Sequence, residues 1–146
     1  MAMQRRSFVS AAAAATLVAL VPVHSSAQTA QSAPNRAIFQ VTDNDPARWN
    51  MILNNMTNLR EGVGSEAVEI ELVAYGPGIL MLKGDSAVRQ RIAEAVKSGV
   101  KVNACQNTMN AMKLAPSDML GEIGHVPSGV VEVMRKQQQG WAYIRS

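Results

Sequence analysis

The feature that most constrains this chain is the alternation of strand-like and helix-like segments that begins near Ala37. Short β-prone runs lie at 37–41, 68–75, 100–104, 122–126 and 141–144. Segments with apolar residues at helical spacing separate these runs. Strands that alternate with helices indicate βαβ units, so we predict an α/β fold with a mostly parallel sheet of about five strands and helices on both faces.

Local signals place several of the helix ends. Asp45 followed by Pro46 is typical of a helix start, with Asp as the N-cap and Pro in the first turn. A second helix is expected to start near Asp85 or Ser86 and to end at Gly99. The segment 115–124 is ambiguous, because the pattern allows a loop as well as the weak strand at 122–126.

The first 27 residues have the pattern of an export signal. Arg5 and Arg6 precede an apolar run, Ala11 to Val23, that is shorter than the roughly twenty residues of a spanning helix. Small residues before Ala27 favour cleavage there. The stretch from Gln4 to Val9 resembles a twin-arginine signal, although an ordinary secretory signal or a retained anchor also fits. We therefore predict a periplasmic protein that leaves the membrane after cleavage.

Removal of that signal changes the charge balance. The whole chain has 14 Lys and Arg against 11 Asp and Glu, and loss of the two signal arginines leaves 12 against 11. A net charge near +1 argues against nucleic-acid binding. Residues 28–35 are small and polar, which predicts a flexible lead-in, and 36–146 is long enough for one domain.

Cysteine and histidine are scarce in the predicted mature protein. The chain has one cysteine, Cys105, which excludes an internal disulfide and a CxxC redox pair. The mature part has one histidine, His125, so one chain cannot build a structural zinc site of several Cys and His ligands. We predict neither a metal nor a cofactor.

The candidate site residues follow the predicted strands. In open α/β sheets, ligands bind beyond the carboxyl ends of the strands. Cys105 and His125 are the candidate catalytic residues at this edge. The candidate ligand-binding residues there are Asn44, Tyr75, Gly76, Gly78 and Asn107. Gly76-Pro77-Gly78 would let the backbone approach a ligand closely, but it is first of all a turn former.

Cys105 is the strongest candidate, because it stands where a strand leads into a helix. Amide groups and the helix dipole at that position stabilise a thiolate and make the sulfur nucleophilic. His125 could favour the thiolate further or simply pack at a turn. A buried apolar role for the cysteine is the alternative. Met109 and Met112 share a helical face with Cys105, which suits Cu(I) but is also typical of core packing.

The mature sequence resembles the DsrE/DsrF-like family, small α/β proteins of sulfur metabolism. The matching segments are VEIELVAYGPGI at 68–79, SGV at 98–100, KVNACQNTM at 101–109 and QGWAYI at 139–144. This resemblance implies a three-layer α/β/α fold and assembly into oligomers. In the sulfur-relay members, the cysteine that matches Cys105 accepts sulfane sulfur as a persulfide and passes it on.

The resemblance therefore implies a sulfurtransferase-like sulfur carrier whose partners are a sulfur donor and a thiol acceptor. It also implies assembly into homo- or hetero-oligomers, of which we expect a homo-oligomer. The rival interpretation is a non-catalytic module that binds a small ligand or metal, or serves assembly, and has an inert cysteine. Glu69 and Glu71 alternate onto one face of a strand and are interpreted as a polar edge.

Overall fold

The five predicted strands form a single sheet in the computed structural model, which describes residues 35–145. The strands are β1 (Asn35–Val41), β2 (Val68–Ala74), β3 (Lys101–Cys105), β4 (Gly124–Val126) and β5 (Ala142–Arg145). Their order is β4-β3-β2-β1-β5, and every neighbouring pair is parallel. This arrangement confirms the predicted fold class. The predicted signal segment, 1–27, and lead-in residues 28–34 lie outside the described residues.

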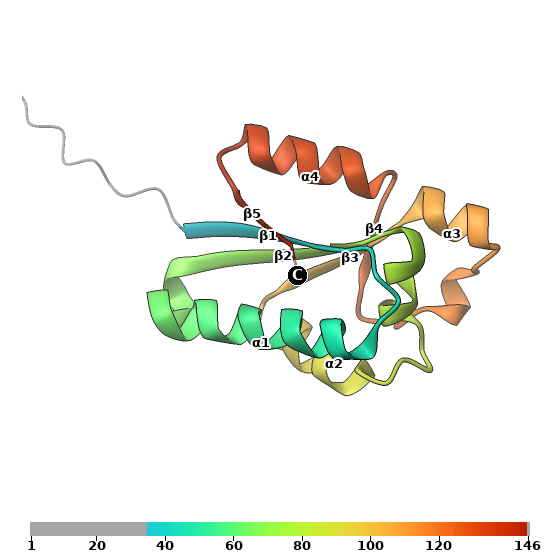
Figure 1. Cartoon of the computed structure of the whole chain (residues 1–146), viewed down its shortest axis with the longest axis horizontal. Coiled ribbons are helices and arrows are strands. Elements are labelled where there is room, and N and C mark those ends of the chain that lie inside the picture. Colours follow the sequence, from blue (N-terminus) through green and yellow to red (C-terminus); the bar gives the residue numbers. More distant parts are fainter. Residues whose placement is uncertain (1–34, 146) are drawn as a thin grey trace, which may run out of the picture. The chain divides into compact units, whose positions relative to one another are not determined.

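Helices cover both faces of the sheet, which makes three layers (Figure 1). The helices are α1 (Pro46–Val63), α2 (Arg89–Lys97), α3 (Gln106–Met112) and α4 (Gly129–Gln138). Figure 1 shows α1 and α2 on one face of the sheet and α4 on the other, with α3 beyond the end of β3. Between residues 35 and 145, none of the helices has the length and apolarity needed to cross a bilayer.

The start of α1 forms as its sequence predicts. Asp45 is the N-cap, and its side chain accepts a hydrogen bond of 2.8 Å from the Ala47 amide. Pro46 occupies the first turn, where its missing N–H costs nothing because that group has no partner within a helix. The apolar stripe of this helix is buried against the sheet: Trp49, Ile52, Leu53 and Met56.

Two predicted boundaries differ from the structure. The second helix was expected near Asp85 or Ser86 but begins at Arg89. Ser86 is buried and forms a turn instead: its hydroxyl accepts from the Val88 amide (3.3 Å) and its carbonyl from the Arg89 amide (3.1 Å). The ambiguous segment before β4 is mostly irregular. It contains one short 3-10 turn, Pro116–Asp118, and the strand itself has only three residues.

The two faces of the sheet have cores of different size. The α1/α2 face carries a large apolar cluster, to which β1 contributes Phe39 and β2 contributes Leu72, both with no exposed surface. On the α4 face, the cluster of buried apolar residues is small: Ile38, Val73, Val133 and Trp141. The candidate functional site lies on the α4 face, beside the smaller apolar cluster.

Candidate functional site

The carboxyl ends of the first four strands lie at one edge of the parallel sheet, as the sequence predicted. Hydrogen bonds join the loops that follow these ends. Three of them link backbone groups: Tyr75 N–H to Val41 O (3.1 Å), Gly78 N–H to Thr42 O (3.0 Å) and Asn107 N–H to Pro127 O (3.2 Å). The Gly76 amide also donates to Thr108 Oγ1 at 3.1 Å. The edge is therefore one connected layer around the start of α3.

Cys105 is the last residue of β3 and the N-cap of α3. It pairs in register with Val126, which packs against the small cluster on the α4 face. Because side chains in register point to the same face of a sheet, the Cys105 side chain faces α4. Only 4% of the residue surface is exposed.

The surroundings of the sulfur favour its ionised form. Burial by itself raises the pKa of the Cys105 thiol, because the interior solvates a thiolate poorly. Donors that face the sulfur outweigh burial and bring the pKa below its ordinary value: the Thr108 hydroxyl, then the backbone amides of Gly129, Thr108 and Asn107. These donors belong to the first turns of α3 and α4. Two helix N-termini, each the positive end of a helix dipole, therefore stabilise the thiolate.

Tyr75 lies in the same neighbourhood. Its ring packs directly on Gly129, where an added Cβ would lie 2.6 Å from Tyr75 Cδ1. Burial raises the pKa of the Tyr75 hydroxyl and charge repulsion from Tyr143 raises it further, whereas Arg145 lowers it and Cys105 adds a smaller increase. The phenol thus stays protonated, and Tyr75 and Cys105 share one electrostatic environment.

The two glycines predicted to bind a ligand have different surroundings. Gly76 has a φ of +54°, a conformation that favours glycine, and its amide is used by Thr108. Gly78 is buried against the loop after β1, where an added Cβ would lie 2.5 Å from the Val41 carbonyl oxygen. The absence of a side chain at Gly78 therefore serves backbone packing, and a contact between Gly78 and a ligand stays a prediction.

His125 does not lie beside the cysteine as expected. It pairs in register with Ala104, which belongs to the core on the α1/α2 face. By strand alternation the imidazole therefore points to the opposite face of the sheet from the Cys105 side chain. His125 is also exposed on an edge strand, and the prediction that its ring favours the thiolate has no geometric support.

The remaining candidates are spread along the edge. Asn44 is exposed in the loop between β1 and α1, whereas Asn107 is exposed in the first turn of α3, with its amide facing the sulfur. Met109 is fully buried in the large core and Met112 is 41% exposed, so the two do not form a sulfur ligand set with Cys105. Among the described residues, no group of three or more His, Cys, Asp and Glu side chains could hold a metal ion.

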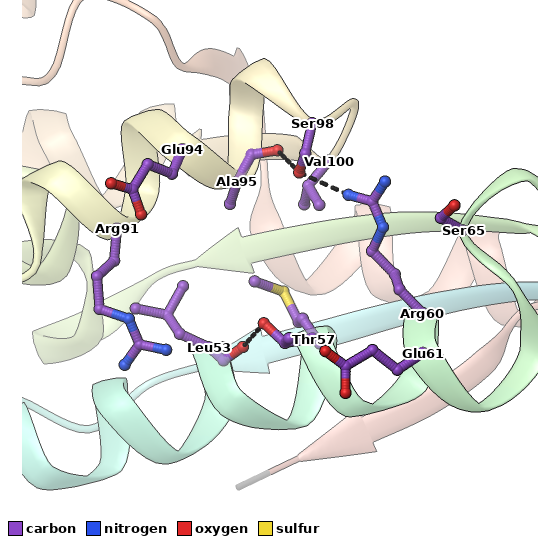
Figure 2. A pocket seen from close by; sticks show the side chains of 11 residues that line it. Leu53, Thr57, Arg60, Glu61, Ser65, Arg91, Glu94, Ala95, Ser98 and Val100 are labelled. Atoms are coloured by element: carbon purple, nitrogen blue, oxygen red, sulfur yellow. Dashed lines mark hydrogen bonds between the residues drawn. The ribbon is translucent and has the colours of Figure 1, made fainter.

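A groove of about 400 Å³ lies between α1 and α2 (Figure 2). Arg60 spans it and donates to Ser98 Oγ, and Arg91 donates to the side-chain oxygens of Asn50 and Asn54, each at 2.7 Å. Val100, just before β3, also lines it, which places the groove at the opposite edge of the sheet from Cys105. Both arginines are already engaged within the chain, so we assign no site there.

The model of the DsrE/DsrF-like family matches residues 35–145, the whole of the described domain. The chain belongs to the DsrE/DsrF-like family. This confirms the family predicted from the sequence, and the family is associated with sulfur relay.

Solved structures share the DsrE/DsrF-like fold. A protein of unknown function from Methanobacterium thermoautotrophicum is 36% identical with a TM-score of 0.73, and the match covers 77% of this chain and 99% of that one. One from Bacteroides thetaiotaomicron is 18% identical, with a TM-score of 0.65 and coverage of 80% and 99%. The ychN protein from E. coli is 12% identical, with a TM-score of 0.63 and coverage of 77% and 99%. No curated protein matches the sequence.

Three residues have roles that the sequence did not predict: Thr108 and Gly129 face the Cys105 sulfur, and Glu71 pairs with Lys136 of α4. Thr108 stands three residues after Cys105, a spacing at which a helical side chain reaches back to the N-cap. Gly129 follows Pro127 and Ser128 at the start of α4, and no local pattern indicates that its amide lies near the sulfur. Glu71 was interpreted as part of a polar edge, but it is 1% exposed and sits beneath α4.

Proposed function

We propose that Cys105 is a sulfur-accepting nucleophile that carries sulfane sulfur as a persulfide and transfers it to a thiol acceptor. One observation carries this proposal: donors from the first turns of both α3 and α4 face the sulfur and lower the pKa of the thiol despite its burial. A thiolate is the nucleophile in sulfur exchange. The association of the family with sulfur relay supports the same reaction.

The transfer needs no external oxidant or reductant. The Cys105 thiolate attacks the terminal sulfur of a donor persulfide or polysulfide. A new S–S bond forms at Cys105 as the donor's S–S bond breaks, and the donor leaves as a thiolate that takes up a proton from solvent. In the second half, an acceptor thiolate attacks the terminal sulfur of the Cys105 persulfide. The Cys105 thiolate is the leaving group, and its low pKa favours that departure.

The donors around the sulfur suit both halves of the reaction. The Thr108 hydroxyl and the Gly129 amide stabilise the Cys105 thiolate before attack and again when it leaves. Because Cys105 is only 4% exposed, a small linear donor such as polysulfide reaches the sulfur more easily than the surface of a folded donor protein does. Asn107 and Pro127 are exposed beside it and would be the first residues such a donor meets.

Cellular location and assembly complete the proposal. The twin-arginine-like segment supports export to the periplasm, with cleavage near Ala27. Assembly into a homo-oligomer would cover apolar side chains such as Val130 and Met134, which are 59% and 49% exposed on α4.

Sulfur loading tests the reaction directly. After incubation with polysulfide, the intact mass of the wild-type protein should increase by one or more sulfur atoms, and that of Cys105→Ser should not. Dithiothreitol should remove the added mass. A wild-type protein that stays unmodified under these conditions contradicts the proposal and favours the rival view of an inert cysteine.

Thr108→Val keeps the cysteine and removes one donor. We expect slower sulfur loading at neutral pH, because the thiolate fraction falls when the hydroxyl is lost. Thr57→Val is the matched control, since the Thr57 hydroxyl donates only to the Leu53 carbonyl within α1. Equal loading rates for the two variants would remove Thr108 from the mechanism.

A further inference from the structure

Helix α4 contacts β2 and the residue that follows it, Tyr75, at three successive points along its buried face. Lys136 Nζ lies 2.7 Å from Glu71 Oε2, Val133 packs in the same cluster as Val73, and Gly129 rests on the ring of Tyr75. The strand residues are spaced by two and the helix residues by four and three, the spacings at which side chains share a face. The helix therefore runs antiparallel to β2, with an ion pair near one end and the cysteine site at the other.

The Glu71–Lys136 pair is built into the interior. The side chain of Glu71 is 2% exposed and that of Lys136 is 15% exposed. The second carboxylate oxygen of Glu71 accepts a hydrogen bond of 2.9 Å from Asn103 Nδ2. Lys136 Nζ also lies 3.5 Å from Glu132 Oε1 and 4.3 Å from the centre of the Trp141 ring. Both ions are thus partnered on several sides, as a buried pair requires.

Apolar packing alone attaches α4 only weakly. The cluster under this helix has four buried residues, of which Val133 is the only one that α4 contributes. The ion pair adds a short, buried polar contact between α4 and the sheet, and loss of one partner would leave the other charge unpaired in the interior. A rigid helix transmits this anchoring over the two turns, roughly 10 Å, that separate Lys136 from Gly129.

We propose that Lys136, through Glu71, is a positioning residue for the cysteine site: the pair holds α4 in the place where the Gly129 amide faces the Cys105 sulfur. Its importance for sulfur transfer rests on the function proposed above, but its effect on the thiol does not. Neither residue touches the sulfur, so the effect is carried by the position of the helix.

The test measures the rate of Cys105 alkylation by iodoacetamide as a function of pH. In Lys136→Met we expect the midpoint of the rate profile to move to higher pH and the rate at pH 7 to fall several-fold. Arg135→Met is the matched control: it removes one positive charge from the exposed side of the same helix, and its profile should match the wild type. Lys136→Arg should restore part of the wild-type profile.

A second variant separates positioning from unfolding. Lys136→Met leaves Glu71 without its partner and could unfold the protein. The thiol of an unfolded chain has an unperturbed pKa, so unfolding would also raise the alkylation midpoint. Glu71→Gln combined with Lys136→Met removes both charges of the buried pair and leaves the net charge of the pair unchanged. Glu132 also loses Lys136 as a neighbour, but its side chain is 20% exposed and keeps contact with water. We expect this double variant to keep its circular dichroism spectrum and cooperative melt while its alkylation midpoint remains raised.

The outcomes distinguish this inference from the proposed function. A folded double variant with the wild-type midpoint overturns the positioning role, whatever the sulfur-loading result. A raised midpoint in the double variant, together with a wild-type protein that takes up no sulfur, supports the positioning role and contradicts sulfur transfer.

Discussion

The two faces of the sheet differ in the polarity of the side chains that the same strands direct toward them. Toward α1 and α2, the buried side chains of β1 and β2 are apolar, such as Phe39 and Leu72. Toward α4, the neighbouring positions of these strands and β3 include Gln40, Glu71 and Cys105 alongside apolar residues. One face is a large apolar core and the other is a small core with polar and ionisable groups built into it.

This difference separates the source of stability from the source of reactivity. Burial of apolar area is the main favourable term in folding, and most of it lies on the α1/α2 face. A buried nucleophile needs hydrogen-bond donors that point at it, and an apolar core does not supply such donors. The α4 face provides these donors through helix starts and holds its helix with an ion pair. Mutations on the two faces should therefore have different consequences.

The largest expected effect is on the apolar face. Phe39→Ala should lower the free energy of unfolding by about 3–5 kcal/mol, because it removes a fully buried ring from the core and leaves a cavity. Urea denaturation measures this loss. In the folded variant, the pH profile of Cys105 alkylation should stay at the wild-type position. Its neighbour Ile38, which faces α4, provides the contrast: Ile38→Ala should cost about 2–3 kcal/mol and also shift that profile.

If the alkylation profile moves equally in both variants, the two faces are not independent. The comparison would then fail, and the cysteine site would depend on global packing rather than on α4.

A smaller effect is expected where α4 meets Tyr75. Gly129→Ala adds a Cβ that would lie 2.6 Å from the Tyr75 ring, so the helix start must shift. We expect a loss of about 1–3 kcal/mol in unfolding free energy from overpacking, together with slower alkylation of Cys105 at neutral pH. Gly121→Ala is the control, because nothing lies within 4 Å of its added Cβ, and it should change stability by less than about 0.5 kcal/mol. If Gly129→Ala changed stability and alkylation as little as Gly121→Ala, the contact between Gly129 and the Tyr75 ring would have room for a methyl group.

The smallest effect is the pH dependence of stability through one thiol. Because the pKa of Cys105 is lower in the folded state than in the unfolded state, the thiolate stabilises the fold above the unfolded pKa. This contribution is lost as the pH falls through the folded pKa. The difference in unfolding free energy between wild type and Cys105→Ser should therefore grow from pH 6 to pH 9, by at most about 1.4 kcal/mol per pH unit for one proton.

Denaturation under reducing conditions at several pH values measures that difference. A difference that is flat or shrinks with rising pH would mean that the α4 face does not favour the thiolate.

The sequence was informative wherever a structural signal is local. Asp45 and Pro46 predicted the start of α1, and Gly99 predicted the end of α2, because caps depend on residues a few positions apart. The position of Cys105 at a strand–helix junction was also local and is confirmed. Helix α2 begins later than predicted, since the Ser86 side chain forms a turn that competes with the helix.

What failed was the assignment of residues to faces at the sheet edges. His125 is the middle residue of a strand of only three residues, and a register difference of one residue moves a side chain to the other face. Glu71 was interpreted as part of a polar edge together with Glu69. Alternation shows that these two residues share a face of the strand, but it does not show whether a helix covers that face. At Gly78 the structure adds a close approach that the sequence did not predict, to the end of β1 and the residue after it, and a ligand contact there stays a prediction.

The sequence by itself determined the order of strands and helices, the parallel sheet and the place of the only cysteine before a helix. These follow from periodicity and capping, which act over a few residues. Only the tertiary structure decided that a second helix start, the one at Gly129, also faces the sulfur, and that Glu71 and Lys136 hold that helix. Those contacts join residues between 24 and 65 positions apart, and pairing over such distances depends on how the layers pack rather than on any local pattern.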